Sequence, residues 1–314
     1  MERELAVRDW HWEITKDCNL KCLHCILGGR GGQELTTQES LMVISRIVQL
    51  GGKTLRITGG EPLMRKDLGL IIQEAHASGL GLDLITNGTM IDDDFLRKYA
   101  RCLGHMAISI DGQEQVHEYL RGNGSYKKSI LSARRVMDAG IDLSVYITIH
   151  SLNEDSLGLL MEELISIGVG SFHFNEINME GRASKNQHLL LGKDKTSDRM
   201  DRILSQLQKT VDVGHVSKDS SCSISSDSVY LASDGAVHAC VEIAFKSPEQ
   251  KIAHILDQEI EGKIIQFFSG VIIPINCICR YSLFSMQGIS VLLNESEKCP
   301  IIKEGRFDNE QSST

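Results

Sequence analysis

The segment that decides the fold is Cys18-Asn19-Leu20-Lys21-Cys22-Leu23-His24-Cys25, which places three cysteines within eight residues. It follows residues 12–15, a short apolar and β-branched stretch that predicts a strand. Thiolates at this spacing wrap a loop around one metal centre, but a structural zinc site needs a fourth ligand, and no second cysteine pair follows at a finger-like distance. An iron–sulfur cluster held by three thiolates instead keeps one iron open, which is typical of catalysis.

From residue 11 to about residue 177, short β-type stretches alternate with amphipathic stretches typical of helices. Strands are expected at residues 12–15, 55–58, 82–86, 106–110, 143–149 and 172–175. Helices are expected at residues 38–50, 67–79, from residue 92 onward, at 126–139 and at 153–167. Such alternation builds a parallel sheet from βαβ units, and six of these units predict an α/β fold with a partial (β/α)6 TIM-type barrel.

The last third of the chain has a different composition. Residues 186–218 are polar and charged, which indicates a bridging segment. Ser233-Asp234-Gly235 then lies between two β-type stretches and predicts a hairpin, with which a small α+β domain begins. The expected organisation is a lead-in at 1–10, the barrel at 11–185, the bridge at 186–218, a cluster-binding domain at 219–308 and a tail at 309–314.

Composition narrows the function classes. The 314 residues carry 33 Lys and Arg against 42 Asp and Glu, a formal charge of −9, which argues against nucleic acid and anionic membranes as partners. No stretch approaches the roughly 20 apolar residues of a membrane span, and the charged N-terminus lacks an apolar signal region. A cytoplasmic location is therefore expected, where the nine cysteines are better suited to metals or reactive chemistry than to disulfides.

Four motifs follow four successive strands. Cys-x3-Cys-x2-Cys follows the first, Gly59-Gly60-Glu61-Pro62 the second, Thr86-Asn87-Gly88 the third and Ser109-Ile110-Asp111-Gly112 the fourth. Together they resemble the radical S-adenosylmethionine (radical SAM) superfamily over about residues 10–185. The resemblance implies a [4Fe-4S] cluster on Cys18, Cys22 and Cys25, with SAM at the open iron. It implies SAM contacts from His24, Gly59, Gly60, Glu61, Pro62, Asn87, Ser109, Asp111 and Arg182.

A second group of cysteines lies near the C-terminus. Cys222-x12-Gly235-x4-Cys240 resembles the opening of SPASM and twitch domains, which bind auxiliary iron–sulfur clusters. The resemblance implies one auxiliary [4Fe-4S] cluster, held by Cys222, Cys240 and two of Cys277, Cys279 and Cys299; a zinc ribbon is the alternative. Five C-terminal cysteines exceed the four ligands of one cluster, so one is spare, either as a catalytic hydrogen-atom donor or as a small buried apolar side chain; the donor candidates are Cys222, Cys277, Cys279 and Cys299.

The resemblance implies an enzyme that cleaves SAM to a 5′-deoxyadenosyl radical. The leading expectation is hydrogen abstraction from a peptide in the maturation of a ribosomally made product, by epimerisation, crosslinking or thioether formation. Without an added leader-binding domain, a separate leader-peptide-binding protein or the barrel mouth would recognise the substrate. Alternatives are a dehydrogenase or epimerase of an aminoglycoside or other sugar, a haem-pathway enzyme, or a non-catalytic iron–sulfur electron carrier. Flavodoxin or ferredoxin is the expected reductant.

Overall fold

The computed structural model describes residues 7–28, 32–177, 180–191, 220–221, 228–270, 280–286 and 289–295. The strands are β1 Asp9–Glu13, β2 Thr54–Thr58, β3 Gly81–Thr86, β4 His105–Ser109, β5 Asp142–Ile149, β6 Ser171–Glu176, β7 Ser220–Ser221, β8 Ser228–Leu231, β9 Ala236–His238, β10 Ala253–His254, β11 Arg280–Met286 and β12 Ile289–Glu295. The α-helices are α1 Thr37–Gln49, α2 Leu68–Ala77, α3 Asp93–Tyr99, α4 Glu114–Arg121, α5 Ser125–Asp138, α6 Leu157–Ser166, α8 Val241–Lys246 and α9 Ile260–Gly270. Short 3-10 turns are η1 Pro62–Met64, η2 Ala100–Cys102, η3 Glu154–Ser156, η4 Ala183–Lys185 and η5 Gln187–Leu189.

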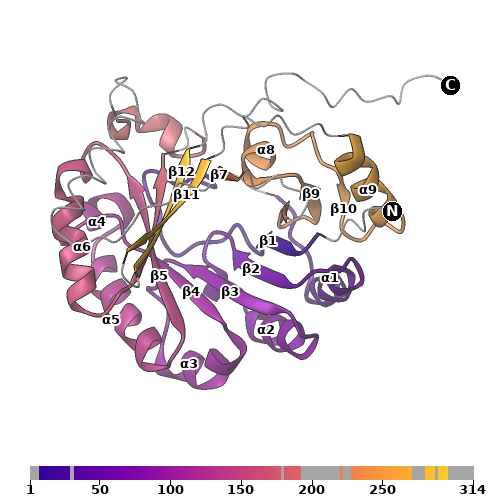
Figure 1. Ribbon diagram of the computed structural model, residues 1–314, viewed down its shortest axis with the longest axis horizontal. Helices are drawn as coiled ribbons and strands as arrows, with labels where there is room; N and C mark the ends of the chain where they lie inside the picture. The colour runs from indigo at the N-terminus through magenta and orange to yellow at the C-terminus, as the bar shows by residue number, and fades with distance from the viewer. Residues whose placement is uncertain are drawn as a thin grey trace.

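Strands β1 to β6 lie side by side in chain order and pair in parallel. Figure 1 shows the curved sheet with the connecting helices around its outside. The predicted α/β fold with a partial barrel is thereby confirmed. Among the described strands the sheet runs β10-β9-β8-β1-β2-β3-β4-β5-β6-β12-β11-β7, so it has two edges and does not close.

The hairpin predicted around Asp234-Gly235 forms from β8 and β9, which pair antiparallel. Strand β8 pairs in parallel with β1, with Trp10 opposite Val229, so the hairpin extends the barrel sheet beyond its first strand. Helices α8 and α9, orange in Figure 1, lie beside this extension. The part of residues 219–308 that the structure describes is thus joined to the barrel by backbone hydrogen bonds, while the domain boundaries stay a prediction.

Local sequence explains where the helices begin and what they cover. Helix α1 starts with a capping box, in which the Thr36 side chain accepts from the Glu39 amide and the Glu39 carboxylate accepts from the Thr36 amide. Its buried face includes Ile44 and Ile47. Trp10 and Trp12 on β1 are also fully buried, in the same apolar core between the sheet and its outer helices.

Successive side chains point to opposite faces of a strand, so every second residue points into the barrel. Around His11, Arg56 and Asp83 this interior is polar. The Arg56 guanidinium on β2 lies 3.0 Å from His11 Nε2 on β1 and pairs with Asp83 on β3 at 3.1 Å. Burial, followed by the nearby Arg56, lowers the pKa of His11 to about 3. No helix in the described ranges is long and apolar enough to cross a membrane.

The loop between β1 and α1, here called the cluster loop (described residues 14–28 and 32–36), is held at both ends by one buried side chain. The Arg65 guanidinium donates to the Ile14 carbonyl at 2.6 Å and to the Leu35 carbonyl at 2.9 Å. Its own charge is balanced by Asp67 at 2.7 Å. Glu34 adds a second tie, because its carboxylate accepts from the Lys16 amide at 2.6 Å. The loop therefore leaves and re-enters the fold at fixed points.

We predict that Arg65→Met lowers the free energy of unfolding by about 3 kcal/mol, because it leaves buried carbonyls and Asp67 without their donor. Urea unfolding of the purified variants measures this change. Arg97→Met on the surface of α3, where the side chain is 71% exposed, is the matched control and should change stability by less than about 0.5 kcal/mol. Equal stabilities of the two variants would contradict the assigned role of Arg65.

Candidate functional site

A cavity of about 330 Å³ opens at the carboxyl ends of the barrel strands. Its described lining is Cys18, Cys22, His24, Cys25, Ile26, Leu27, Thr58, Gly59, Gly60, Ile85, Thr86, Asn87, Ser109, Arg121, Thr148, Asn175, Ile177, Arg182 and Val241. Strand ends β2, β3 and β4 supply Thr58, Thr86 and Ser109, while the cluster loop covers another side of the cavity. This is the edge at which parallel α/β barrels place their chemistry.

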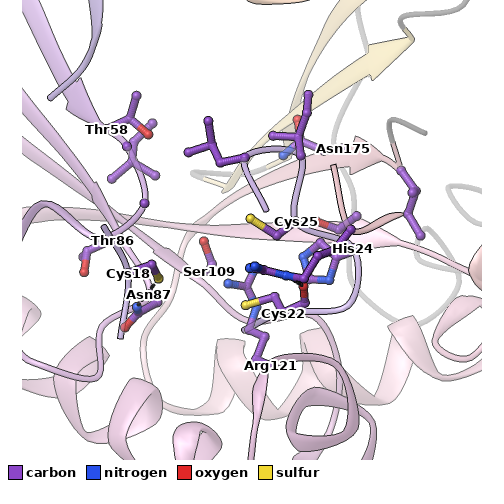
Figure 2. A pocket seen from close by; sticks show the side chains of 18 of the residues that line it. Cys18, Cys22, His24, Cys25, Thr58, Thr86, Asn87, Ser109, Arg121 and Asn175 are labelled. Carbon is purple, nitrogen blue, oxygen red and sulfur yellow. Dashed lines mark hydrogen bonds between the residues drawn. The ribbon is translucent and has the colours of Figure 1, made fainter. Parts of the chain in front are cut away.

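The three predicted cluster ligands line this cavity together. Figure 2 shows the sulfur atoms of Cys18, Cys22 and Cys25 at separate points around the central space. In the described ranges no group of three or more His, Cys, Asp or Glu side chains converges closely enough to hold a single metal ion. Three thiols spaced around a shared volume fit a polynuclear iron–sulfur cluster, in which each thiolate would bind a different iron.

The thiols need positive charge to ionise. Burial raises the pKa of Cys22 to about 11, and Arg121 acts in the opposite direction. Burial also raises the pKa of Cys18, whose sulfur accepts from the Leu20 amide at 3.4 Å. Metal binding requires thiolates, so the buried Arg121 guanidinium and a bound iron cluster both favour the required form.

Arg121, at the end of α4, is a cavity residue that the sequence analysis did not identify. Its Nε donates to Asp111 Oδ2 at 2.5 Å, and its side chain is only 10% exposed. Burial raises the pKa of Asp111, but Arg121 and then His24 outweigh burial and hold that pKa well below its ordinary value. Asp111 also accepts from the Thr148 amide at 2.7 Å, so it lies beneath the cavity as an anchor and outside its described lining.

His24 lines the cavity and lies close to Asp111. Its Nε2 lies 3.4 Å from Asp111 Oδ2, while its buried Nδ1 has no hydrogen-bond partner in the described part of the chain. Burial lowers the pKa of His24 to about 4, which keeps the ring neutral at pH 7. The Asp111 carboxylate therefore lies beside the neutral His24 ring at the border of the cavity.

The Glu61 side chain is directed into the protein and does not contribute to the described lining. Its carboxylate accepts from Thr86 Oγ1 at 2.7 Å, from the Asn87 amide at 2.8 Å and from the Leu63 amide at 3.2 Å. Glu61 therefore fixes the end of β3, which carries Thr86 and Asn87 into the cavity. Pro62 is buried and begins η1, again outside the described lining.

Gly60 lies directly against the cluster loop. Its amide donates to the Thr15 carbonyl at 2.7 Å, and the next amide, of Glu61, donates to the Asp17 carbonyl at 2.7 Å. A Cβ at Gly60 would lie 2.2 Å from the Asp17 oxygen, and one at Gly59, where φ is +148°, would lie 2.4 Å from the Thr15 oxygen. Both positions need glycine because backbone meets backbone there.

Arg182 holds the loop from the opposite side. Its Nε donates to the Cys22 carbonyl at 2.8 Å and its amide donates to the Cys25 carbonyl at 2.9 Å. Arg182 also lines the cavity, so its side chain both holds the cluster loop and forms part of the site.

The structure thus brings together most of the residues assigned to SAM or its cluster, and places the others just behind them. In the cavity lining are Cys18, Cys22, Cys25, His24, Gly59, Gly60, Asn87, Ser109 and Arg182. Glu61, Pro62 and Asp111 lie outside the described lining. Sequence reasoning missed Arg121, Thr148, Asn175 and Val241. Thr148 and Asn175 could have been found from the sequence, because they lie near the ends of predicted strands. Nothing in the sequence indicated that Arg121, in a polar stretch, or Val241, at the start of α8, would line the cavity.

Only one of the predicted auxiliary ligands can be placed. Cys240 is buried immediately before α8, next to Val241 of the cavity lining. Cys222, Cys277, Cys279 and Cys299 lie outside the described residues. The auxiliary cluster and the spare hydrogen donor therefore stay predictions.

Comparison with known proteins identifies the domain that contains the three cysteines. Residues 12–164 match the family model of the Radical SAM superfamily, so the chain contains a radical SAM domain. It is 27% identical over 208 residues to Fe-coproporphyrin III synthase of Methanosarcina barkeri (strain Fusaro / DSM 804), covering 65% of this chain and 52% of that protein. It is 31% identical over 151 residues to the mycofactocin maturase MftC of Mycolicibacterium smegmatis (strain ATCC 700084 / mc(2)155), covering 46% and 38%.

Among solved structures, Streptococcus suis SuiB bound to S-adenosylmethionine superposes with a TM-score of 0.68 at 12% identity, covering 87% of this chain and 70% of SuiB. At that identity the likeness shows the fold alone. The chain spans about half the length of the curated relatives it matches first.

We predict that Gly60→Ala destabilises the protein by about 1–3 kcal/mol and lowers the iron bound after reconstitution, because the new methyl group displaces the cluster loop backbone. Urea unfolding and iron analysis measure the two effects. Gly158→Ala is the matched control, since its Cβ meets nothing within 4 Å on helix α6, and it should raise stability by about 0.5–1 kcal/mol. Full iron binding by Gly60→Ala would contradict the close approach described above.

Proposed function

We propose that this chain is a radical SAM enzyme that cleaves S-adenosylmethionine reductively and abstracts a hydrogen atom from a peptide substrate. The observation that carries the proposal is that Cys18, Cys22 and Cys25 all line one cavity at the carboxyl edge of the barrel. A radical SAM domain and enzymatic relatives support the class of reaction. A non-catalytic electron carrier would not need the additional strand-end residues that form the rest of this cavity.

In this proposal the residues of the cavity have separate tasks. The three thiolates hold a [4Fe-4S] cluster, and Arg121 offsets part of their negative charge. The strand ends that carry Gly59, Asn87 and Ser109 border the space for SAM. When bound there, the cluster supplies one-electron reduction of SAM, which breaks a sulfur–carbon bond to give methionine and a 5′-deoxyadenosyl radical. Ile26, Leu27 and Val241 limit the access of water, which protects a reactive intermediate.

A peptide substrate is supported by the maturase relative and, at the level of fold, by SuiB, which has also been solved with its precursor peptide SuiA. A tetrapyrrole of the haem pathway is the second candidate, because the similarity to Fe-coproporphyrin III synthase covers more of this chain than the similarity to the maturase. We further propose an auxiliary [4Fe-4S] cluster that includes Cys240, and reduction by flavodoxin or ferredoxin in the cytoplasm.

We predict that Cys22→Ala abolishes formation of 5′-deoxyadenosine, because the cluster loses one of three ligands. The assay is anaerobic reconstitution, addition of SAM and dithionite, and chromatography of the products. Cys102→Ala is the matched control: Cys102 packs against the core at η2, outside the cavity lining, and its loss should leave cleavage within about twofold. A wild-type protein with an intact cluster but no 5′-deoxyadenosine would refute the enzymatic proposal.

The substrate class is tested by turnover in deuterated water with two candidates, a precursor peptide encoded beside this gene and a haem-pathway tetrapyrrole. We expect the peptide to gain one deuterium at an inverted carbon or to lose two hydrogens, and the tetrapyrrole to stay unchanged. Mass spectrometry separates these outcomes. A tetrapyrrole that loses or oxidises a side chain, beside an unchanged peptide, would move the proposal to the haem pathway.

A further inference from the structure

A second cavity of about 230 Å³ lies beside the β8–β9 hairpin and is here called the hairpin cavity. Its described lining is Glu13, Lys16, Tyr230, Ala232, Asp234, Ala236, His238, Ala244, Phe245, Pro248, Glu249 and Lys251. None of these residues appears in the described lining of the cluster cavity. Nothing in the chemistry proposed above uses this space.

An apolar partition lies between the two cavities. Tyr230 and Phe245, with ring centroids 5.9 Å apart, pack with Ala244 against Ile26, Leu27 and Val241. The last three residues line the cluster cavity, whereas the first three line the hairpin cavity. A ligand in the hairpin cavity would therefore press on the wall of the radical site without entering it.

The inner end of the hairpin cavity holds a buried carboxylate. Glu13 is 3% exposed and accepts from Tyr230 Oη at 2.6 Å and from Ser233 Oγ at 3.1 Å. A carboxylate offers about four acceptor positions, so these two hydroxyl donors and the Ser233 amide, which also bonds to it, still leave acceptor capacity unused. Within the described residues no cation forms a salt bridge with Glu13, although Lys16 acts on it at longer range. A buried carboxylate without a cation carries a large desolvation cost that a cationic ligand would offset.

A second acceptor faces the same space. His238 is 2% exposed, and its Nδ1 lies 3.3 Å from the Gln250 carbonyl oxygen, which accepts only. Nδ1 therefore carries the proton, and in the neutral ring Nε2 is a bare acceptor, for which the described residues provide no donor. Exposed Asp234 and Glu249 add negative charge at the mouth, where Lys251 is the exposed cation.

We infer that the hairpin cavity binds a primary alkylammonium group, presented either by a small amine or by a lysine side chain of a peptide. An ammonium has three donors and a compact positive charge, which match a buried carboxylate and an imidazole nitrogen. The cavity is smaller than the roughly 300–1,000 Å³ of sites for drug-sized ligands, so it suits one such group with its alkyl chain. The ammonium enters between Asp234 and Glu249 and pairs with Glu13.

Calorimetric titration of the anaerobically reconstituted full chain with n-butylammonium chloride, in the absence of SAM and reductant, tests this site. We expect saturable binding of one molecule per chain. n-Butyltrimethylammonium, which keeps the charge but has no N–H donor, should bind about tenfold or more weakly. Absence of saturable butylammonium binding, or equal binding of the two cations, would overturn the inference.

Two variants connect the binding to the cavity. Glu13→Gln should weaken butylammonium about tenfold or more, whereas Glu249→Gln at the exposed mouth should change it by less than about threefold. If Glu13→Gln does not fold, Ala232→Leu keeps the carboxylate and fills the cavity from its partly exposed rim, and it should abolish binding. Wild-type affinity in the folded Glu13→Gln protein, or in Ala232→Leu, would place the ammonium elsewhere.

A second titration with N-acetyl-Gly-Lys-Gly-amide distinguishes the two sources of the ammonium. Binding of this peptide together with butylammonium supports a lysine side chain as the occupant, and binding of butylammonium alone supports a small amine. Because neither titration needs SAM cleavage, loss of ammonium binding and failure of the radical reaction are separate results. SAM cleavage by Glu13→Gln, with the cluster cavity intact, should stay within about twofold of the wild type.

Discussion

One buried guanidinium holds the loop on which the proposed chemistry depends. Arg65 donates to the Ile14 and Leu35 carbonyls, which lie where the cluster loop leaves β1 and where it approaches α1. A loop that carries three cysteines gains nothing from secondary structure of its own, so its geometry has to be imposed by fixed ends and by backbone contacts. The glycines after β2 supply those contacts, because only a residue without a side chain allows two backbones to meet there.

Charge balance is the second constraint on the site. Three thiols and the Asp111 carboxylate are held in or beneath one cavity, where burial makes each negative charge costly without a partner. The Arg121 guanidinium supplies the positive charge, because it forms an ion pair with Asp111 and acts to lower the pKa of Cys22. Asp111 in turn contacts both Arg121 and His24. A residue outside the described lining therefore sets the orientation of two side chains that line the cavity.

The hairpin joins the barrel to the cysteine-rich part of the chain through ordinary strand pairing. Because β8 pairs with β1, Glu13 at the end of β1 meets Tyr230 and Ser233 of the hairpin, and Val241 of α8 reaches the cluster cavity. The same pairing creates a second, acceptor-rich cavity behind the apolar wall of the first. One apolar partition therefore borders both cavities.

The sequence by itself determined the βα order, the strand ends that carry the motifs and the grouping of three cysteines, because hydrophobic periodicity and ligand spacing are local properties. It did not determine where individual side chains point. Glu61 lies in a motif assigned to SAM, yet its carboxylate binds the end of β3, and Arg121 lies on α4, a helix the polar pattern of residues 114–121 did not predict. Only tertiary structure decided these roles, because they depend on strand register and on which buried charges meet across the barrel.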